Sequence, residues 1–313
     1  MRWKAEQLEH VPCDLCQSHG DALFHVRGDG MKVVQCSQCG LVYLNPRPKP
    51  EFIEELYQKE YFENSGGTDG IGYSAYIEQS AQPFTFYAMR QRLRFLGGYV
   101  KVKGADCLEI GCATGEMCCV ISKCGGKVLG IDVSEEAVAI ARQRYPHLDF
   151  RVATVEELPE SVQYDVIFGF ELIEHTLSPT KFMKEVAARL RPGGTVVLST
   201  PNLECGRRVG FDRWLGFLQS FEHLYYFTPD TLSAVAQTAG LTMYDWYTSG
   251  GDGTVESTKP VSRYPRLKRV LSRLGLYNSV KTLHLALARP KIVFERQGQQ
   301  HNLLAILVRS QKG

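Results

Sequence analysis

The segment Leu108–Gly115, with the sequence LEIGCATG, constrains the fold of this chain more than any other part of it. An apolar strand runs into a glycine turn there, and the next apolar segment ends at Asp132, 21 residues after Gly111. This order is the layout of a nucleoside-binding α/β domain, in which the acidic residue holds the ribose. We therefore expect an α/β fold that binds its ligand at the carboxyl ends of parallel strands.

Apolar segments and helix signals alternate from residue 107 onward. Short continuous apolar runs suit strands that are covered on both faces, and N-cap residues such as Ser134 and Ser178 mark the helices between them. Repeated βα units of this kind form a doubly wound, mostly parallel sheet. The expected strands are 108–110, 128–131, 150–152, 165–170, 195–199, 242–247 and 302–308.

The glycine turn itself narrows the choice of ligand. A dinucleotide fingerprint needs glycines at 111, 113 and 116, whereas this chain has Gly111, Ala113 and Glu116, and no Walker lysine follows the loop. Gly111 and Gly115 leave room for a ligand without a pyrophosphate, and the two oxygens of Asp132 can accept both ribose hydroxyls. The pattern favours a nucleoside ligand that carries no pyrophosphate.

Four of the ten cysteines form two closely spaced pairs near the N-terminus. Cys13-x-x-Cys16 and Cys36-x-x-Cys39 are separated by 19 residues, a spacing typical of structural zinc sites, and Gly40 follows where the turn needs a small residue. Four thiolates complete a tetrahedral site, so the ion would be structural and not catalytic. The alternative is a set of four reduced thiols that bind no metal.

Composition and charge favour a cytoplasmic protein. The 313 residues are 44% apolar and carry a net charge of +2, which gives no general affinity for polyanions. No apolar run approaches the roughly 20 residues of a membrane span, and the N-terminus lacks the apolar core of a signal peptide.

Residues 250–300 differ from the rest, because they hold ten Lys or Arg against three acids. Within them, 263–281 are amphipathic. We expect either a solvated helix packed on the sheet edge or contact with an anionic partner. That partner would be a phosphate handle on a substrate, a membrane surface or RNA.

These motifs resemble the class I S-adenosylmethionine-dependent methyltransferases over about residues 90–249. The resemblance rests on Leu108–Gly115, Gly130–Asp132, Tyr164–His175 and Leu190–Gly194. It implies a Rossmann-like α/β fold, a seven-stranded sheet with an antiparallel last strand, and S-adenosyl-L-methionine as cofactor. The four cysteines and the following segment Gly40–Pro48 (GLVYLNPRP) resemble the zinc module of a subgroup that often modifies sugars or other small metabolites. That implies a small-molecule acceptor, with an anionic one among the options, rather than a nucleic acid.

The same resemblance implies which residues contact the cofactor. Glu109 supports its methionine end, Asp132 holds the ribose, and Phe170 lies beside the methyl group. The backbone comes close to the cofactor at Gly111, Ala113 and Gly115, and Thr154 and Val155 flank the adenine.

In methyl transfer the enzyme aligns the acceptor with an activated methyl group. Where the acceptor is a hydroxyl or a carbon acid, the enzyme also removes a proton from it. Glu171, Glu174 and His175 follow the fourth strand, and on a helical turn their side chains share a face. Three roles are open for these side chains. They would hold a divalent ion, or act as a general base with its orienting partner, or have only a structural role in starting the helix and packing. His223 follows the fifth strand, where acceptor loops usually lie. We predict His223, His175 and Glu171 as catalytic residues.

Three regions follow from these patterns. We expect a zinc-binding module over 1–50, a helical linker or cap over 51–100, and a methyltransferase domain over 101–313 with insertions at 202–227 and 250–300. Two alternatives stay open: an RNA methyltransferase that grips RNA with its zinc module, and a non-catalytic cofactor-binding scaffold. The sequence does not reveal the oligomeric state.

Overall fold

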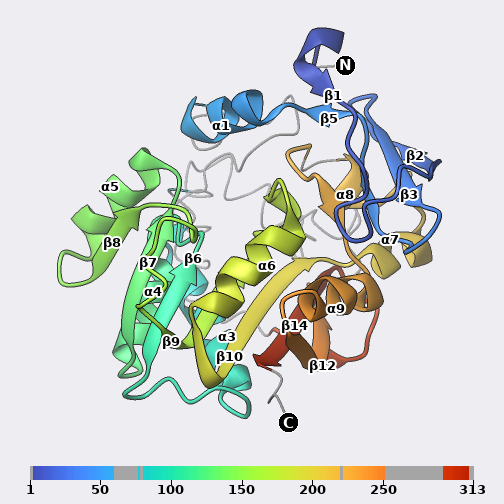
Figure 1. The fold of residues 1–313 in the computed structure, drawn as a ribbon. Coiled ribbons are helices and arrows are strands. Elements are labelled where there is room, and N and C mark those ends of the chain that lie inside the picture. The colour runs from blue at the N-terminus through green and yellow to red at the C-terminus, as the bar shows by residue number, and fades with distance from the viewer. Residues whose placement is uncertain (1–2, 60–76, 78–79, 219–220, 251–291, 310–313) are drawn as a thin grey trace, which may run out of the picture.

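Eight strands form one mixed sheet at the centre of the molecule, in the order β13-β12-β14-β10-β9-β6-β7-β8 (Figure 1). The computed structural model describes residues 3–59, 77, 80–218, 221–250 and 292–309. From β10 to β8 every neighbouring pair is parallel, whereas β14 runs antiparallel between β10 and β12. The α/β fold predicted from the sequence is confirmed.

Each strand predicted from an apolar run is present, and most extend beyond that run. The eighth strand, β13, corrects the expected number of seven: it is a two-residue edge strand of exposed polar residues that pairs with β12 and gives no apolar signal. The strands are β6 (Asp106–Ile110), β7 (Lys127–Asp132), β8 (Asp149–Val152), β9 (Tyr164–Phe170), β10 (Leu190–Pro201), β12 (Leu241–Ser249), β13 (Glu295–Arg296) and β14 (Asn302–Arg309).

Local capping chemistry sets where several helices begin. The side chains of Ser134 and Ser178 accept hydrogen bonds from the backbone N–H groups of Ala137 and Lys181, as expected of N-cap residues. The α-helices are α1 (Pro50–Lys59), α3 (Pro83–Leu96), α4 (Glu116–Lys123), α5 (Glu135–Arg144), α6 (Pro179–Ala188), α7 (Leu203–Val209), α8 (Leu215–Leu218) and α9 (Pro229–Gln237), and the 3-10 helices are η1 (Ala5–Gln7) and η2 (Ile173–His175).

Helices cover both faces of the sheet, and the strands alternate between two cores. Val196 and Leu198 of β10 face the core that holds the apolar residues of α6 and α9. Val197, between them, faces the core formed with α3 and α4. This period of two is what a strand buried on both faces requires. Among the described residues, a cavity remains at the carboxyl ends of β6 to β9.

The cysteine pairs lie in a second, smaller sheet that the far half of the chain completes. It comprises β2 (Asp21–Val26), β3 (Lys32–Cys36), β4 (Val42–Leu44) and β11 (Tyr225–Tyr226), in the order β11-β4-β3-β2. A separate ladder joins β1 (Leu8–Glu9) to β5 (Arg47–Pro48). Because β11 pairs with β4, the predicted module over 1–50 shares a sheet with the predicted insertion over 202–227.

Two predicted features lie wholly or partly outside the described residues. The first is the predicted cap, in which most of residues 60–79 are not described. The second is the basic segment, in which residues 251–291 are not described, including the amphipathic residues 263–281. None of the helices that the structure describes is long and apolar enough to cross a membrane.

Candidate active site

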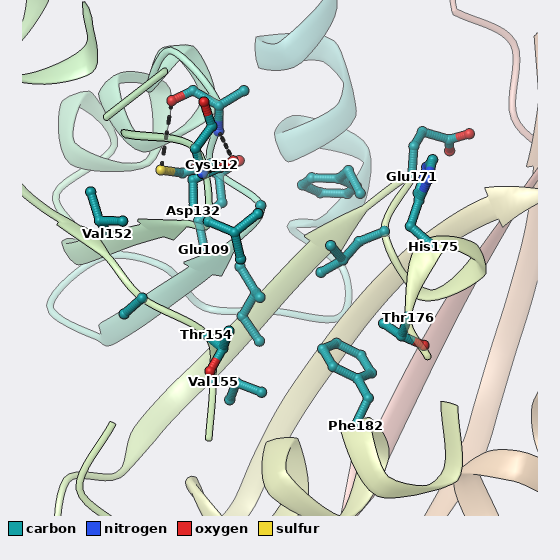
Figure 2. Close-up of a pocket in the computed structure, with 18 of the residues that line it drawn as sticks. Glu109, Cys112, Asp132, Val152, Thr154, Val155, Glu171, His175, Thr176 and Phe182 are labelled. Carbon is teal, nitrogen blue, oxygen red and sulfur yellow. Dashed lines mark hydrogen bonds between the residues drawn. The ribbon is translucent and has the colours of Figure 1, made fainter. Parts of the chain in front are cut away.

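A pocket of about 820 Å³ lies at the carboxyl ends of β6, β7, β8 and β9 (Figure 2). Parallel α/β sheets bind their ligands at this edge, and the volume falls in the range of ligand sites, roughly 300–1,000 Å³. Ile53 of α1 and Met89 of α3 add to its wall. Nine residues predicted from the sequence line it: Glu109, Gly111, Ala113, Asp132, Thr154, Val155, Phe170, Glu171 and His175.

Asp132 fixes the glycine turn and also faces the pocket. Its Oδ2 accepts a hydrogen bond from the backbone N–H of Ala113 at 2.8 Å, and its Oδ1 accepts one from that of Ser134 at 2.9 Å. The first bond helps to hold Ala113 at a φ of +45°, a left-handed conformation that residues other than glycine seldom adopt. Each carboxylate oxygen keeps a further lone pair, so Asp132 can accept ribose hydroxyls while it holds the loop.

Gly115 does not line the pocket, unlike Gly111 and Ala113. It precedes α4 with a φ of +86°, and a Cβ at this position would lie 2.7 Å from Cζ of Phe150. The backbone conformation and the packing of Phe150 are therefore enough to require glycine here.

Glu109 is buried at the end of β6 and still faces the pocket. Its Oε2 accepts a hydrogen bond from the thiol of Cys118 at 2.8 Å. Burial raises the pKa of Glu109 to about 8 because the charged form loses its hydration, and the nearby carboxylates of Glu116 and Asp132 raise the pKa further. Without a ligand, this carboxyl group therefore holds its proton at neutral pH.

Arg92 of α3 is a pocket residue that the sequence analysis missed. Its guanidinium carbon lies 4.8 Å from the centre of the Phe170 ring. Burial lowers the pKa of Arg92, whereas the nearby carboxylates of Glu171 and Glu109 oppose that shift. The residues two positions before and after it in α3 are also arginines, so only the tertiary packing reveals which of the three enters the pocket.

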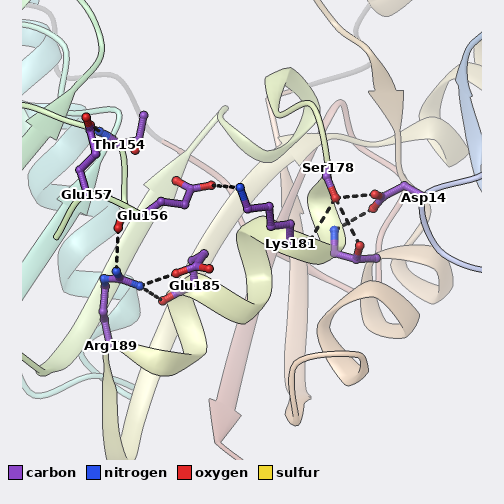
Figure 3. Close-up of polar contacts among 9 residues, drawn as sticks. Asp14, Thr154, Glu156, Glu157, Ser178, Lys181, Glu185 and Arg189 are labelled. Atoms are coloured by element: carbon purple, nitrogen blue, oxygen red, sulfur yellow. Dashed lines mark hydrogen bonds and ion pairs between the residues drawn. The ribbon is translucent and has the colours of Figure 1, made fainter. Parts of the chain in front are cut away.

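The side of the pocket expected to hold adenine is built by the segment after β8 and the start of α6 (Figure 3). The backbone N–H of Thr154 donates a hydrogen bond to Oε2 of Glu157 at 2.7 Å. Lys181 of α6 lies 3.9 Å from a carboxylate oxygen of Glu156, and buried Arg189 donates a hydrogen bond to the backbone carbonyl of Glu156 at 3.1 Å. These contacts fix the loop that follows Thr154.

Glu171 does not take part in the helical turn expected after the fourth strand. It adopts a left-handed φ of +49°, and its Oε1 accepts a hydrogen bond from the hydroxyl of Ser199 at 2.5 Å. The helix η2 begins only at Ile173. Glu171 therefore lies outside the helical turn that carries Glu174 and His175, which corrects the predicted shared turn.

His223 joins Glu174 and His175 in place of Glu171. One ligand-type atom from each of these three side chains lies within 4.8 Å of the other two. The imidazole rings of His175 and His223 meet edge to face, with their centres 4.7 Å apart. His175 lines the pocket, whereas His223 and Glu174 do not. Of these two imidazoles, that of His175 faces the pocket, and that of His223 packs against it.

Burial keeps both imidazoles neutral. It lowers the pKa of His175 to about 3 and that of His223 well below its ordinary value. Burial also raises the pKa of Glu174 well above its ordinary value, and the carboxylate of Glu171 adds to this rise. Among the described residues, no hydrogen bond reaches the carboxylate oxygens of Glu174 or Nδ1 of His223. Buried polar atoms of this kind are rare, and a bound ion would satisfy them.

The four cysteines of the small sheet meet in one cluster. Sγ of Cys13 lies 3.4 Å from that of Cys39, and Sγ of Cys16 lies 3.5 Å from that of Cys36. Zn–S bonds of about 2.3 Å place the sulfurs of a tetrahedral site about 3.8 Å apart, so the cluster has the size of such a site. Gly40 takes a φ of +75°, as the turn after the second pair requires.

A family model described as a methyltransferase domain matches residues 81–245, more than half of the chain. The chain belongs to the methyltransferase-domain family. The matched residues include β6 to β10 and α6, which build most of the pocket wall. Residues 81–245 are therefore a methyltransferase domain, as the sequence resemblance implied.

Curated relatives match parts of the methyltransferase domain. A probable S-adenosylmethionine-dependent methyltransferase of Mycolicibacterium smegmatis is 40% identical over 100 residues, which are 32% of this chain and 39% of that protein. A ubiquinone biosynthesis O-methyltransferase of Bradyrhizobium diazoefficiens is 35% identical over 103 residues, 32% of this chain and 41% of that protein. One of Coxiella burnetii is 28% identical over 165 residues, 49% of this chain and 70% of that protein. The chain thus spans about two fifths of the length of the first two proteins.

Solved methyltransferases share the fold. An S-adenosylmethionine-dependent methyltransferase of Thermotoga maritima superposes with a TM-score of 0.50 and 16% identity, over 75% of this chain and 95% of that one. Magnesium protoporphyrin IX methyltransferase of Synechocystis, with bound S-adenosylhomocysteine (SAH), gives a TM-score of 0.50 and 12% identity, over 83% of this chain and 99% of that one. At these identities the likeness shows the fold alone.

Proposed function

We propose that this protein transfers the methyl group of S-adenosylmethionine to a small-molecule acceptor. The pocket carries the proposal, because Glu109 and Asp132 lie in the same cavity as Glu171 and His175 (Figure 2). The transfer is an in-line displacement, and alignment of the reactants lowers its barrier by roughly 7–11 kcal/mol. A single cavity of about 820 Å³ that admits both reactants supports that alignment.

The charges of the pocket suit this cofactor. Glu109 would meet the ammonium group of the methionine end, and Arg92, which is close to Glu109 and Glu171, would pair with the carboxylate of that end. Asp132 would accept the ribose hydroxyls. The loop after Thr154 would face the adenine ring.

The lining also favours a small acceptor over RNA. Its excess of carboxylates repels a phosphate backbone, whereas it attracts a sulfonium. The ubiquinone biosynthesis O-methyltransferases among the relatives support a hydroxyl as the accepting group. Among the described residues, and apart from Glu109, which holds its proton, the charged lining residues are Glu54, Glu116, Asp132, Glu156, Glu157 and Glu171 against Arg92 and Lys181.

In this proposal Glu171 takes the proton of the acceptor. It follows β9 at the pocket wall beside Phe170, where the methyl group is expected. Burial raises its pKa above the ordinary value, which moves the carboxylate toward the range of an efficient general base. The hydrogen bond from Ser199 fixes the direction of its carboxylate. His175 then orients the acceptor as a neutral imidazole, and His223 supports the ring of His175.

Two metal ions fit the described side chains. The four-cysteine cluster has the donor set and the sulfur spacing of a structural zinc site, and none of its cysteines lines the pocket. Glu174, His175 and His223 offer one carboxylate and two imidazoles, a donor set that suits a divalent ion. Such an ion would polarise an acceptor oxygen when bound.

Three measurements test the proposal. Calorimetry of the folded protein should show heat with S-adenosylmethionine and with SAH, and mass spectrometry of the purified protein should identify co-purified ligands. Elemental analysis should find about one zinc per chain. Filter binding of RNA at two salt concentrations tests the alternative, since tight, steeply salt-dependent binding would favour RNA methylation. Absence of any heat with either compound would overturn the assignment.

The variant His223→Ala addresses catalysis separately from cofactor binding. We expect it to lose most SAH production in the presence of an acceptor, while the affinity for SAH stays within about twofold of the original, since His223 does not line the pocket. Loss of cofactor binding in this variant would show that His223 has a structural role only.

A further inference from the structure

We infer that Arg27, at the tip of the hairpin between β2 and β3, is a positioning residue for His223. Arg27 lies in the predicted cysteine module, and His223 lies in the insertion of the methyltransferase domain. The catalytic meaning of this contact rests on the proposed function, but the contact itself does not.

The guanidinium of Arg27 is buried and holds the segment that carries His223 at two backbone positions. Its Nη1 donates a hydrogen bond to the carbonyl of His223 at 2.9 Å, and its Nη2 donates one to the carbonyl of Phe221 at 3.0 Å. Nη1 also donates to the hydroxyl of Tyr226 at 3.0 Å. Only 2% of Arg27 is exposed, so water does not compete for these bonds.

Asp29 keeps the guanidinium in this orientation. Its two carboxylate oxygens accept hydrogen bonds from Nε and Nη2 of Arg27, at 3.2 and 2.6 Å. A planar, bidentate fork of this kind fixes the remaining donors in direction, which the single point charge of a lysine does not do. The pair therefore acts as a rigid unit on the tip of the hairpin.

Two further backbone bonds hold the same segment between the two parts of the protein. The N–H of Leu44, at the end of β4, donates to the carbonyl of Leu224 at 2.8 Å. The N–H of Leu224 donates to the carbonyl of Glu174 at 2.8 Å. His223 is thus placed opposite η2 by contacts that come from the small sheet on one side and from η2 on the other.

The ring of His223 depends on this placement. Among the described residues, Nδ1 of His223 has no hydrogen-bond partner. Packing against His175 and Tyr226, with ring centres 4.7 and 6.4 Å away, is what orients it. A shift of the backbone at 221–223 therefore moves the imidazole directly. We conclude that the hairpin of the cysteine module belongs to the catalytic framework, and that its role there is to fix one side chain.

The test compares Arg27→Lys with Arg189→Lys in the full-length protein. Arg189 is a matched control because it is also 2% exposed and also donates to backbone carbonyls, but to those of Leu158 and Glu156 and not to the segment that carries His223. The readouts are the ¹⁵N signals of the histidine rings, with that of His223 assigned from its loss in His223→Ala, and hydrogen exchange of the amides of 221–226.

In Arg27→Lys we expect the His223 signal to shift or broaden, and the amides of 221–226 to exchange about tenfold faster or more. In Arg189→Lys both should match the original protein. If Arg27→Lys does not fold, Asp29→Asn, which loosens the same fork, should give the same two changes in weaker form. An unchanged His223 signal in Arg27→Lys, or equal changes in both arginine variants, would overturn the inference.

The same data separate this inference from the proposed function. If His223→Ala retains full turnover while Arg27→Lys moves the ring, the catalytic role of His223 is wrong and the positioning contact stands. If His223→Ala loses turnover while Arg27→Lys leaves the ring unmoved, the positioning role is wrong and the catalytic role stands.

Discussion

Binding of the cofactor should release a proton from Glu109. Burial raises the pKa of this carboxyl to about 8 in the ligand-free protein. In the complex the ammonium group of the methionine end would face it, and an adjacent positive charge favours the ionised form. At pH 7 the free carboxyl is about 90% protonated, so binding should release about 0.9 proton per chain, falling to about 0.2 at pH 8.5.

The sign of the pH dependence follows from this release. The ligand-free protein holds a proton that the complex does not, so affinity rises with pH until the carboxyl ionises unaided near pH 8. Between pH 7 and 8.5 the ionised fraction grows about eightfold, which corresponds to about 1.3 kcal/mol of binding free energy. Glu109→Gln should remove the pH dependence and bind more weakly at pH 8.5, since it has no charge to offer.

The assay is calorimetry with SAH, which keeps the amino-acid end of the cofactor and is chemically stable. Titrations at pH 7 in two buffers with different ionisation enthalpies give the number of protons released. The result that refutes the reasoning is proton release by Glu109→Gln equal to that of the original protein.

A second check uses unfolding without ligand. The native carboxyl keeps its proton between the unfolded pKa of 4.5 and about 8, so it lowers stability as pH rises through that window, by up to about 1.4 kcal/mol per pH unit. Glu109→Gln should remove that slope.

Three further outcomes are expected. Gly115→Ala should lower the free energy of unfolding by about 2–4 kcal/mol, because φ is positive there and the new Cβ would lie 2.7 Å from Phe150. Gly193 also has a positive φ but open space around it, so Gly193→Ala should lower the free energy of unfolding by about 1 kcal/mol. Urea unfolding measures both changes. Cys36→Ser should leave less than about half the zinc per chain by elemental analysis, with a lower melting temperature, and full zinc content would contradict the four-thiolate site. Asp132→Asn should weaken cofactor binding by about 2 kcal/mol in calorimetry, and unchanged affinity would exclude it from the ribose site.

The central strands of the sheet could be predicted because they are apolar on both faces. Runs such as 165–170 and 195–199 cannot be solvated on either side, so their burial follows from composition alone, whereas Glu295 and Arg296 in β13 carry no such signal. Asp132 could be predicted because it ends a strand at the edge of the sheet where ligands bind.

The candidate site was less predictable, because several of its residues take their places from tertiary contacts. Arg92 differs from the arginines around it only in the direction that α3 gives it. Glu171 leaves the expected helical turn because its bond to Ser199 joins it to the next strand. His223 comes to lie beside His175 through the hairpin that holds its backbone. No spacing within the sequence encodes any of these three placements.

The pairing of β11 with β4 has a consequence for how the chain is made. Tyr43 and Tyr225 come from opposite halves of the chain and lie in register in one sheet. A ribosome that adds about 5–20 residues per second needs on the order of 10–40 s between these two positions. During that interval β4 presents an open strand edge, which is a template for association with other chains. Nascent chains should therefore depend on chaperones most strongly before residue 225 emerges, and amino-terminal fragments that stop short of it should aggregate.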